Sequence, residues 1–152
     1  MQVKGQATLD APRERVFDAI CDPASLLAVI PGCREVQRVS PDEYRGRIAL
    51  RLPGIVGVYD TWVRLVHTDP PAYGELEGRV EGRPGRIQGR ATFALSADGD
   101  RTVVTWDGSA IVSGLLGHLD SRFLEGVAGS LVADGLARLG SRLQENSMVG
   151  AR

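Results

Sequence analysis

The sequence has few cysteines and histidines, and it has no strong excess of either charge. Its 152 residues include two cysteines, two histidines and 18 basic residues against 19 acidic ones, which gives a formal net charge of −1. Two cysteines cannot form a disulfide framework, and the two histidines lack metal-binding spacing. The near-neutral balance leaves no broad basic surface for nucleic acid. We therefore expect no disulfide scaffold, no metal site and no nucleic-acid partner.

Long apolar runs and catalytic motifs are also missing. No run approaches the roughly 20 residues of a membrane span, and the N-terminal Met-Gln-Val-Lys-Gly lacks the apolar core of a signal peptide. We expect a cytoplasmic protein, peripheral at the inner face of the membrane at most. Neither a Gly-x-Ser-x-Gly elbow nor a phosphate-binding Gly-x-x-x-x-Gly-Lys loop is present. Cys33 is a candidate nucleophile, but Arg34 is its one evident cationic neighbour, which favours a structural thiol.

The N-terminal part of the chain has clear strand and helix signals. Residues 2–9 alternate with period two, which predicts a strand. Helical spacing and caps predict two short helices at 10–20 and 24–30. Asp22-Pro23 separates them, and Pro31-Gly32 ends the second. The chain therefore begins as a strand followed by a pair of short helices.

The rest of the chain predicts a sheet and one long helix. Between residues 33 and 112, runs of six to twelve residues separated by Pro- and Gly-containing turns predict about six antiparallel strands. Apolar residues at steps of three or four over 115–144 predict an amphipathic helix. The expected fold class is α+β, a single domain over 1–144 whose curved sheet holds the C-terminal helix. A polar, frayed tail is expected over 145–152.

Glycine is abundant and aromatic residues are few. The 19 glycines accompany three Phe, two Trp and three Tyr, so a large core is hard to fill. Five glycines lie in the last helical segment, where each costs about 1 kcal/mol relative to Ala. They indicate either close packing of the helix on the sheet or space for a ligand. On the second interpretation Gly126 and Gly129 would face a concave sheet.

An arginine-rich segment lies in the middle of the predicted sheet. Residues 78–90 carry four arginines, four glycines and one acid, Glu81. This segment is either a solvated hairpin or a surface for phospholipid headgroups or an acidic partner protein. Aromatic residues do not alternate with the arginines, which disfavours RNA stacking.

A series of short motifs runs along nearly the whole chain. The most specific motif is Ile30-Pro31-Gly32-Cys33. The others, in order, are Ala11-Pro-Arg-Glu-Arg-Val-Phe, Asp22-Pro23, Asp69-Pro70-Pro71, Asp98-Gly99-Asp100, Thr105-Trp106 and Gly114 to Arg122. Over about residues 1–144 this series resembles the G-subunit family of carbon monoxide dehydrogenase, within the START-like (SRPBCC, birch-pollen-allergen-like) superfamily.

This resemblance implies a helix-grip fold, with a seven-stranded antiparallel sheet around the C-terminal helix and an apolar cavity between them. Members of this family accompany molybdenum-containing carbon monoxide dehydrogenases and related hydroxylases as accessory proteins. They are implicated in membrane tethering and in handling menaquinone. Members that anchor themselves often carry a Pro-rich linker and a C-terminal extension. This chain stops at Arg152 without either, so we expect transient membrane contact.

The first functional hypothesis is a binding module for an apolar small molecule, an isoprenoid quinone or a lipid, with no other cofactor. Burial of apolar ligand surface, at roughly 25 cal/mol per Å², would supply the affinity. The expected lining consists of Tyr59, Val63, Leu65, Phe93, Trp106, Phe123, Val127 and Leu131. Tyr59 and Trp106 each have a hydrogen-bond donor for a quinone carbonyl. Core packing explains any one of these residues equally well.

The short helices are expected to form a lid, as they do in this fold generally. Leu26, Leu27, Ile30, Pro31 and Gly32 would lie at the cavity mouth, and the two leucines would enter a bilayer. Replacing both leucines with Asp is then expected to abolish association with liposomes.

Two other hypotheses come from different functional classes. A cyclase or hydratase of the superfamily would need an inward-facing acid, for which Glu75, Glu77 and Asp60 are candidates, although strand alternation places Asp60 outside. A structural adaptor would instead have a fully packed interior, without the roughly 300–1,000 Å³ that is typical of small-molecule sites.

Overall fold

The computed structural model describes the backbone of residues 1–150 and the side chains of residues 1–146. Its elements in chain order are β1 (Gln2–Leu9), α1 (Arg13–Ile20), α2 (Pro23–Val29), β2 (Cys33–Ser40), β3 (Glu43–Leu50), β4 (Gly57–Asp69), β5 (Tyr73–Gly82), β6 (Gly85–Asp98), β7 (Arg101–Ser113), the 3-10 helix η1 (Gly114–His118) and α3 (Ser121–Gly150). The strands form one antiparallel sheet in the order β1-β7-β6-β5-β4-β3-β2. The predicted α+β helix-grip fold is confirmed.

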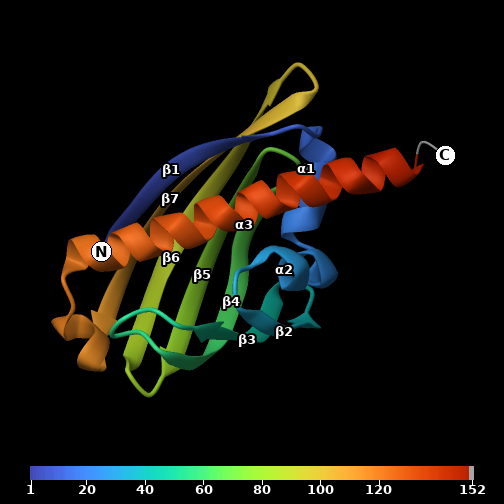
Figure 1. Ribbon diagram of the computed structural model, residues 1–152. Helices are drawn as coiled ribbons and strands as arrows, with labels where there is room; N and C mark the ends of the chain where they lie inside the picture. The colour runs from blue at the N-terminus through green and yellow to red at the C-terminus, as the bar shows by residue number, and fades with distance from the viewer. Residues whose placement is uncertain (151–152) are drawn as a thin grey trace.

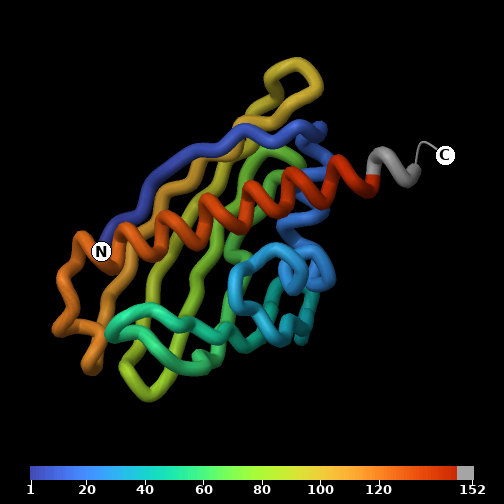
Figure 2. The backbone as a smooth tube through the Cα atoms, in the orientation of Figure 1, coloured from blue at the N-terminus to red at the C-terminus, as the bar shows by residue number. Residues whose placement is uncertain are grey.

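The sheet curves around α3, which crosses its concave side from one end of the molecule to the other (Figure 1). The backbone of α3 lies close to β1, α2 and α1. The short helices flank the C-terminal half of α3, and η1 precedes its N-terminal end (Figure 2). The two ends of α3 are therefore held by different parts of the chain.

The predicted boundaries of the last helix were wrong at both ends. Residues 114–118 form η1, and α3 begins after Asp120, whose carboxylate accepts hydrogen bonds from the backbone N–H groups of Arg122 and Phe123 at 2.8 and 3.3 Å. This acidic cap sits where the helix leaves its first N–H groups unpaired. The helix continues to Gly150, so the predicted tail 145–152 begins as helix, and residues 151–152 lie outside the described residues.

The core is divided into two clusters. The larger one joins α1, α2, β1 and the C-terminal half of α3, and we call this part of the molecule the clamped end. Its buried residues are Leu9, Ala11, Val16, Phe17, Ala19, Val29, Phe93, Leu95, Val104, Leu139 and Leu143. The smaller cluster contains Ile55, Tyr59, Leu116 and Leu124. It lies at the opposite end, which we call the tip: residues 50–58, 82–86 and 113–123.

Hydrogen bonds tie the two short helices to the sheet. The Tyr44 hydroxyl donates to the backbone carbonyl of Cys21 at 2.7 Å, and the Arg38 guanidinium donates to both the same carbonyl and the Tyr44 oxygen, at 2.6 and 2.8 Å. Asp22 caps α2 by accepting from the Ser25 backbone N–H at 3.1 Å. These bonds hold the junction of α1 and α2 against β2 and β3.

Candidate functional site

Small residues cover the middle of the concave face. Across β5, β6 and β7 the register pairs Gly78 with Gly89, Gly89 with Ala110, and Ala91 with Gly108. None of these residues belongs to either core cluster. No large side chain therefore rises from this strip toward the helix that crosses the sheet.

Three aromatic rings on the concave face lie over glycines of a neighbouring strand. Trp106 lies over Gly5, its partner on β1, and Phe93 lies over Gly74, its partner on β5. The Tyr59 ring lies 2.8 Å from the position that a Cβ on Gly82 would take. A side chain at any of these glycines would collide with the ring. The glycines therefore allow the rings to cover the sheet instead of extending toward α3.

The apolar side chains next to the small-residue strip are only half-buried. Val63 and Leu65 on β4 and Leu131 on α3 belong to neither core cluster. Side chains on the concave face of a sheet beneath a helix are normally buried, so this exposure means that water reaches the space between the two clusters. We take this space, bounded by the strip and the middle of α3, as the candidate site.

Trp106, which packs against the core of the clamped end, has an unused hydrogen-bond donor. Its Nε1 is buried and has no hydrogen-bond partner among the described residues. A buried donor without a partner is costly, and tryptophan usually finds one. The other tryptophan, Trp62, lies on the convex face, where its Nε1 donates to Glu43 at 3.4 Å. Trp106 is therefore the residue of the predicted lining with free polar capacity.

The other predicted lining residues are distributed over three environments. Tyr59 is fully buried in the tip cluster, burial raises the pKa of its phenol, and its hydroxyl donates to the Ile55 carbonyl at 3.0 Å, so this donor is already in use. Phe93 belongs to the clamped end, with its ring centre 5.8 Å from that of Phe17. Val127 packs against the tip cluster, and Phe123 is exposed. Val63, Leu65, Trp106 and Leu131 remain the predicted ligand contacts.

The glycines of α3 lie in different surroundings, and they do not all face the sheet. Gly126 is exposed and would meet nothing within 4 Å if it carried a Cβ, so the prediction that it faces the sheet is wrong. Gly129 is half-buried and also free of neighbours. At Gly135 and Gly140 a Cβ would lie 3.8 Å from the Val29 carbonyl and 3.6 Å from Leu9. These are ordinary contact distances, to α2 at Gly135 and to β1 at Gly140, so an alanine would also fit at either position.

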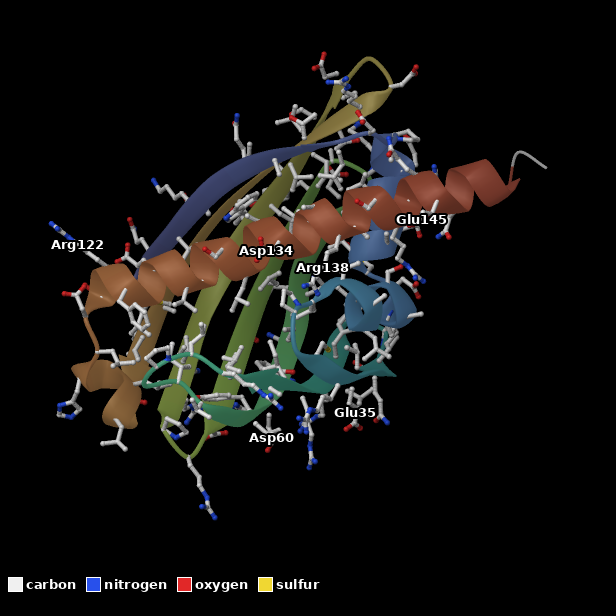
Figure 3. The ribbon with its side chains drawn as sticks, in the orientation of Figure 1. Glu35, Asp60, Arg122, Asp134, Arg138 and Glu145 are labelled. Atoms are coloured by element: carbon white, nitrogen blue, oxygen red, sulfur yellow. The ribbon has the colours of Figure 1, made fainter. Side chains whose placement is uncertain are left out.

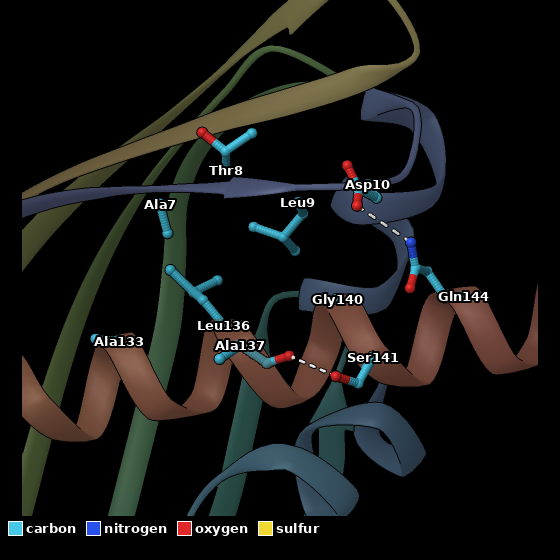
Figure 4. A pocket seen from close by; sticks show the side chains of 10 residues that line it. All are labelled: Ala7, Thr8, Leu9, Asp10, Ala133, Leu136, Ala137, Gly140, Ser141 and Gln144. Atoms are coloured by element: carbon cyan, nitrogen blue, oxygen red, sulfur yellow. Dashed lines mark hydrogen bonds between the residues drawn. The ribbon is translucent and has the colours of Figure 1, made fainter.

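Two pockets open on either side of the C-terminal half of α3. The pocket in Figure 4, of about 250 Å³, lies between β1 and α3, and at its rim Gln144 donates to Asp10 at 3.2 Å. A second pocket of about 400 Å³ lies between α2 and α3 and is lined by Val29, Arg138 and Arg142, among others. Neither pocket contains any of the eight predicted ligand contacts.

The residues of the predicted lid lie on and just after α2. Leu27 is exposed, and Leu26, Ile30 and Pro31 are half-buried. Ile30 packs against the core of the clamped end. The positive φ of Gly32 is a conformation that favours glycine, and a Cβ there would collide with the Ala49 carbonyl. The segment thus packs against β3 and the core of the clamped end, and its lid role remains a prediction.

The candidate catalytic carboxylates lie on the convex face. Asp60 pairs with Arg47 at 3.3 Å and is on the side of the sheet away from α3 (Figure 3). Glu77 pairs with Arg64 at 2.9 Å. Glu75 accepts a hydrogen bond from the Tyr73 hydroxyl at 2.7 Å, which raises the pKa of Tyr73. None of the three carboxylates faces the candidate site.

Neither cysteine resembles an activated nucleophile. Burial raises the pKa of the Cys21 thiol and of the Cys33 thiol, so both are mostly protonated at neutral pH. The Cys33 sulfur donates weakly to the Glu35 carbonyl at 3.6 Å. Within the described residues, no three His, Cys, Asp or Glu side chains gather where they could hold a metal ion.

The arginine-rich segment forms the β5–β6 hairpin. Arg79 lies over the Trp62 ring at 5.3 Å, and Arg79 and Arg86 both approach Glu81 at 3.9 Å. Arg83 is exposed at the turn. The hairpin thus combines two paired arginines, Arg79 and Arg86, with exposed arginines at the turn and, at Arg90, on β6.

The sequence did not identify several residues that shape the candidate site. Gly5, Gly82 and Gly108 were not singled out, although each occupies an inward position that strand alternation could have assigned. Their partners across the sheet are set by register, which a single sequence does not reveal. Period-two spacing was therefore the available signal, but it could not show which glycine lies beside which ring.

Comparison with solved structures supports the fold. A conserved protein from Geobacillus kaustophilus is 25% identical, with a TM-score of 0.90 over 95% of this chain and 96% of that one. A START superfamily protein from Mycobacterium smegmatis is 14% identical, with a TM-score of 0.72 over 95% of this chain and 97% of that one. The Zhui aromatase/cyclase from Streptomyces sp. R1128 is 14% identical, with a TM-score of 0.72 over 97% of this chain and 95% of that one.

Other comparisons bear on the family and on membrane crossing. Among curated proteins no match was found. No helix within residues 1–150 is both long enough and apolar enough to cross a membrane.

The family model for the carbon monoxide dehydrogenase G subunit (CoxG) matches residues 5–144, nearly the whole helix-grip domain. The chain therefore belongs to the CoxG family of carbon monoxide dehydrogenase G subunits.

Proposed function

We propose that this protein binds an apolar small molecule with a hydrogen-bond acceptor, an isoprenoid quinone or a lipid, between the concave face of the sheet and the middle of α3. The single observation that carries the proposal is the incomplete burial of apolar side chains beside the strip of small residues, beneath the middle of α3. A space with half-buried Val63, Leu65 and Leu131 gains stability when an apolar ligand displaces that water. Membership of the CoxG family and the START-like fold support a ligand-binding role.

The Trp106 Nε1 donor supports the requirement for an acceptor on the ligand. An apolar site needs few polar groups to orient its ligand, and one buried N–H that meets a carbonyl oxygen is enough to favour one end of the molecule. A quinone or an acyl ester has such an oxygen, whereas a hydrocarbon chain alone has none. The donor therefore favours carbonyl-containing lipids over plain hydrocarbons.

We further propose that the protein serves as an accessory protein that carries this ligand to or from a molybdenum hydroxylase such as carbon monoxide dehydrogenase. The family name, a subunit of carbon monoxide dehydrogenase, supports association with that enzyme. The candidate carboxylates lie outside the site, so the geometry favours binding over cyclase or hydratase chemistry at that position.

The first test is native mass spectrometry of the protein purified from its own host, followed by solvent extraction and identification of any released compound. We expect a quinone or lipid at near-stoichiometric occupancy. A protein that is empty and also fails to take up added menaquinone would contradict the proposal and favour the packed adaptor.

The role of Trp106 is tested with a matched pair of tryptophan variants. Trp106→Phe removes the free donor but keeps an aromatic ring over Gly5, and Trp62→Phe removes the donor on the convex face. Loss of one neutral hydrogen bond of about 0.5–1.5 kcal/mol predicts roughly 2- to 10-fold weaker menaquinone binding in Trp106→Phe. Trp62→Phe is expected to bind like the wild type. Equal binding by all three proteins would remove Trp106 from the site.

A further inference from the structure

We infer that the tip is a docking surface for an anionic lipid bilayer. The inference extends the proposed function, because a carrier of an apolar ligand must reach the membrane that holds it. The tip comprises the loop 50–58, the β5–β6 turn at 82–86 and the segment 113–123, which gather at one end of the molecule (Figure 2). It lies opposite the end at which α1 and α2 pack.

Specific contacts join these three segments into one surface. The backbone N–H of Leu116 donates to the Pro84 carbonyl at 2.8 Å, which joins η1 to the β5–β6 turn. A Cβ on Gly54 would lie 2.9 Å from the Leu119 side chain, which places the 50–58 loop against the start of α3. Ile55 is buried in the same cluster as Leu116. The tip is therefore a supported structure rather than three independent loops.

Apolar side chains point outward from this support. Leu115 is 72% exposed and Val56 is 64% exposed, and each directly adjoins a buried member of the tip cluster. Phe123, in the first turn of α3, is also exposed. Because Ile55 and Leu116 are held inside, their neighbours Val56 and Leu115 are presented to solvent. Such side chains stabilise contact with the apolar boundary of a bilayer.

Exposed cations lie in the same three segments as these apolar side chains. The three segments contain four arginines and one aspartate, and Arg86 is paired with Glu81 next to the turn, so the net charge with Glu81 included is +2, whereas the whole chain has −1. Arg51, Arg83 and Arg122 are exposed, and none of them forms an ion pair with a described residue. Arg122 points away from the molecule at the start of α3 (Figure 3). Asp120 is occupied in capping the helix.

The combination favours a lipid surface as the occupant. Arginines around exposed aliphatic side chains complement a layer of phosphate headgroups above an apolar interior. The rest of the chain then carries a net −3, the difference between −1 and +2, so an anionic membrane attracts the tip and repels the remainder. This charge division orients the molecule with α1 and α2 away from the bilayer.

The test measures co-sedimentation with vesicles of phosphatidylcholine and phosphatidylglycerol that contain no quinone, so that the result does not depend on the cavity ligand. The tip variant is Val56→Asp/Leu115→Asp. Its matched control is Val39→Asp/Val66→Asp, which changes two valines that are 48% and 50% exposed on strands outside the tip. Both variants add two negative charges, and circular dichroism checks that both are folded.

We expect the wild type and the control to bind the vesicles at low salt, and the tip variant to bind at least ~10-fold more weakly. Binding is expected to fall as salt rises and to be lost on pure phosphatidylcholine vesicles. Equal binding by the tip variant and the control would overturn the inference. So would loss of binding in Leu26→Asp/Leu27→Asp alone, which would assign the contact to α2. A wild type that ignores vesicles but binds an acidic protein would replace the lipid with that partner.

The same variants separate this inference from the proposed function. Menaquinone added in detergent solution is expected to bind the tip variant as it binds the wild type, since Val56 and Leu115 point outward. Lost vesicle binding with retained quinone binding supports docking at the tip. Retained vesicle binding by a protein that takes up no quinone would contradict the proposed cavity while leaving the docking surface intact.

Discussion

The two ends of α3 differ in how they are held. At the clamped end, eleven buried residues from both short helices, the sheet and α3 form one cluster. At the tip, four buried residues support loops whose neighbouring side chains are exposed. The larger cluster excludes more apolar surface from water and therefore contributes more to stability. Stability is therefore concentrated at the clamped end, away from the surface that we assign to membrane contact, and the tip can open locally at a lower free-energy cost.

The largest expected loss of stability comes from truncating a buried side chain at the clamped end. Phe17→Ala removes a buried ring that packs against Phe93 and leaves a cavity among α1, β6 and α3. We expect the free energy of unfolding to fall by about 3–5 kcal/mol. Urea unfolding followed by circular dichroism measures it. A loss below about 1 kcal/mol would mean that the clamped end does not dominate stability.

A smaller loss of stability is expected when a buried side chain of the tip cluster is truncated. Leu116 is fully buried, and Leu116→Ala is expected to lower the free energy of unfolding by about 2–3 kcal/mol, less than Phe17→Ala, because loops relax into a cavity more easily than packed helices. Hydrogen exchange should show faster opening of η1 and the 50–58 loop, with β1 and β7 nearly unchanged. If exchange accelerated equally throughout the sheet, the two ends would form one cooperative unit.

The smallest effect concerns the hydrogen bonds that fasten α1 and α2. Tyr44→Phe removes a donor to the Cys21 carbonyl, and we expect a loss of about 1 kcal/mol in urea unfolding. The matched control is Tyr73→Phe, whose hydroxyl bonds the Glu75 side chain on the convex face, and this change is expected to be near neutral. Equal losses in the two variants would show that the Tyr44 bonds do not specifically secure the clamped end.

Much of the fold could be predicted from local sequence signals. The strand 2–9, the break at Asp22-Pro23 and the turns between strands are each determined by a few neighbouring residues, and the structure confirms them. The start of α3 was predicted too early because Leu115 and Leu116 match helical spacing. The Asp120 cap and the hydrogen bond from Leu116 to Pro84, a tertiary contact, outweigh that spacing.

The candidate site was predictable only in part. Alternation placed Val63, Leu65 and Trp106 on the correct face, because side chains alternate strictly along a strand. It could not show that the Tyr59 hydroxyl bonds a loop carbonyl or that Phe93 belongs to the clamped core. Those environments depend on which distant segment packs over each ring.

The sequence alone determined the α+β class, the order of elements and the absence of strong catalytic motifs, because periodicity, caps and turns act over a few residues. Only the tertiary structure decided that Gly126 faces solvent while Gly135 and Gly140 accept close neighbours, and that Trp106 keeps an unpaired donor among the described residues. It also brought Val56 and Leu115 together at the tip. These outcomes depend on strand register and on the path of α3 across the sheet, which arise from contacts between residues far apart in the chain.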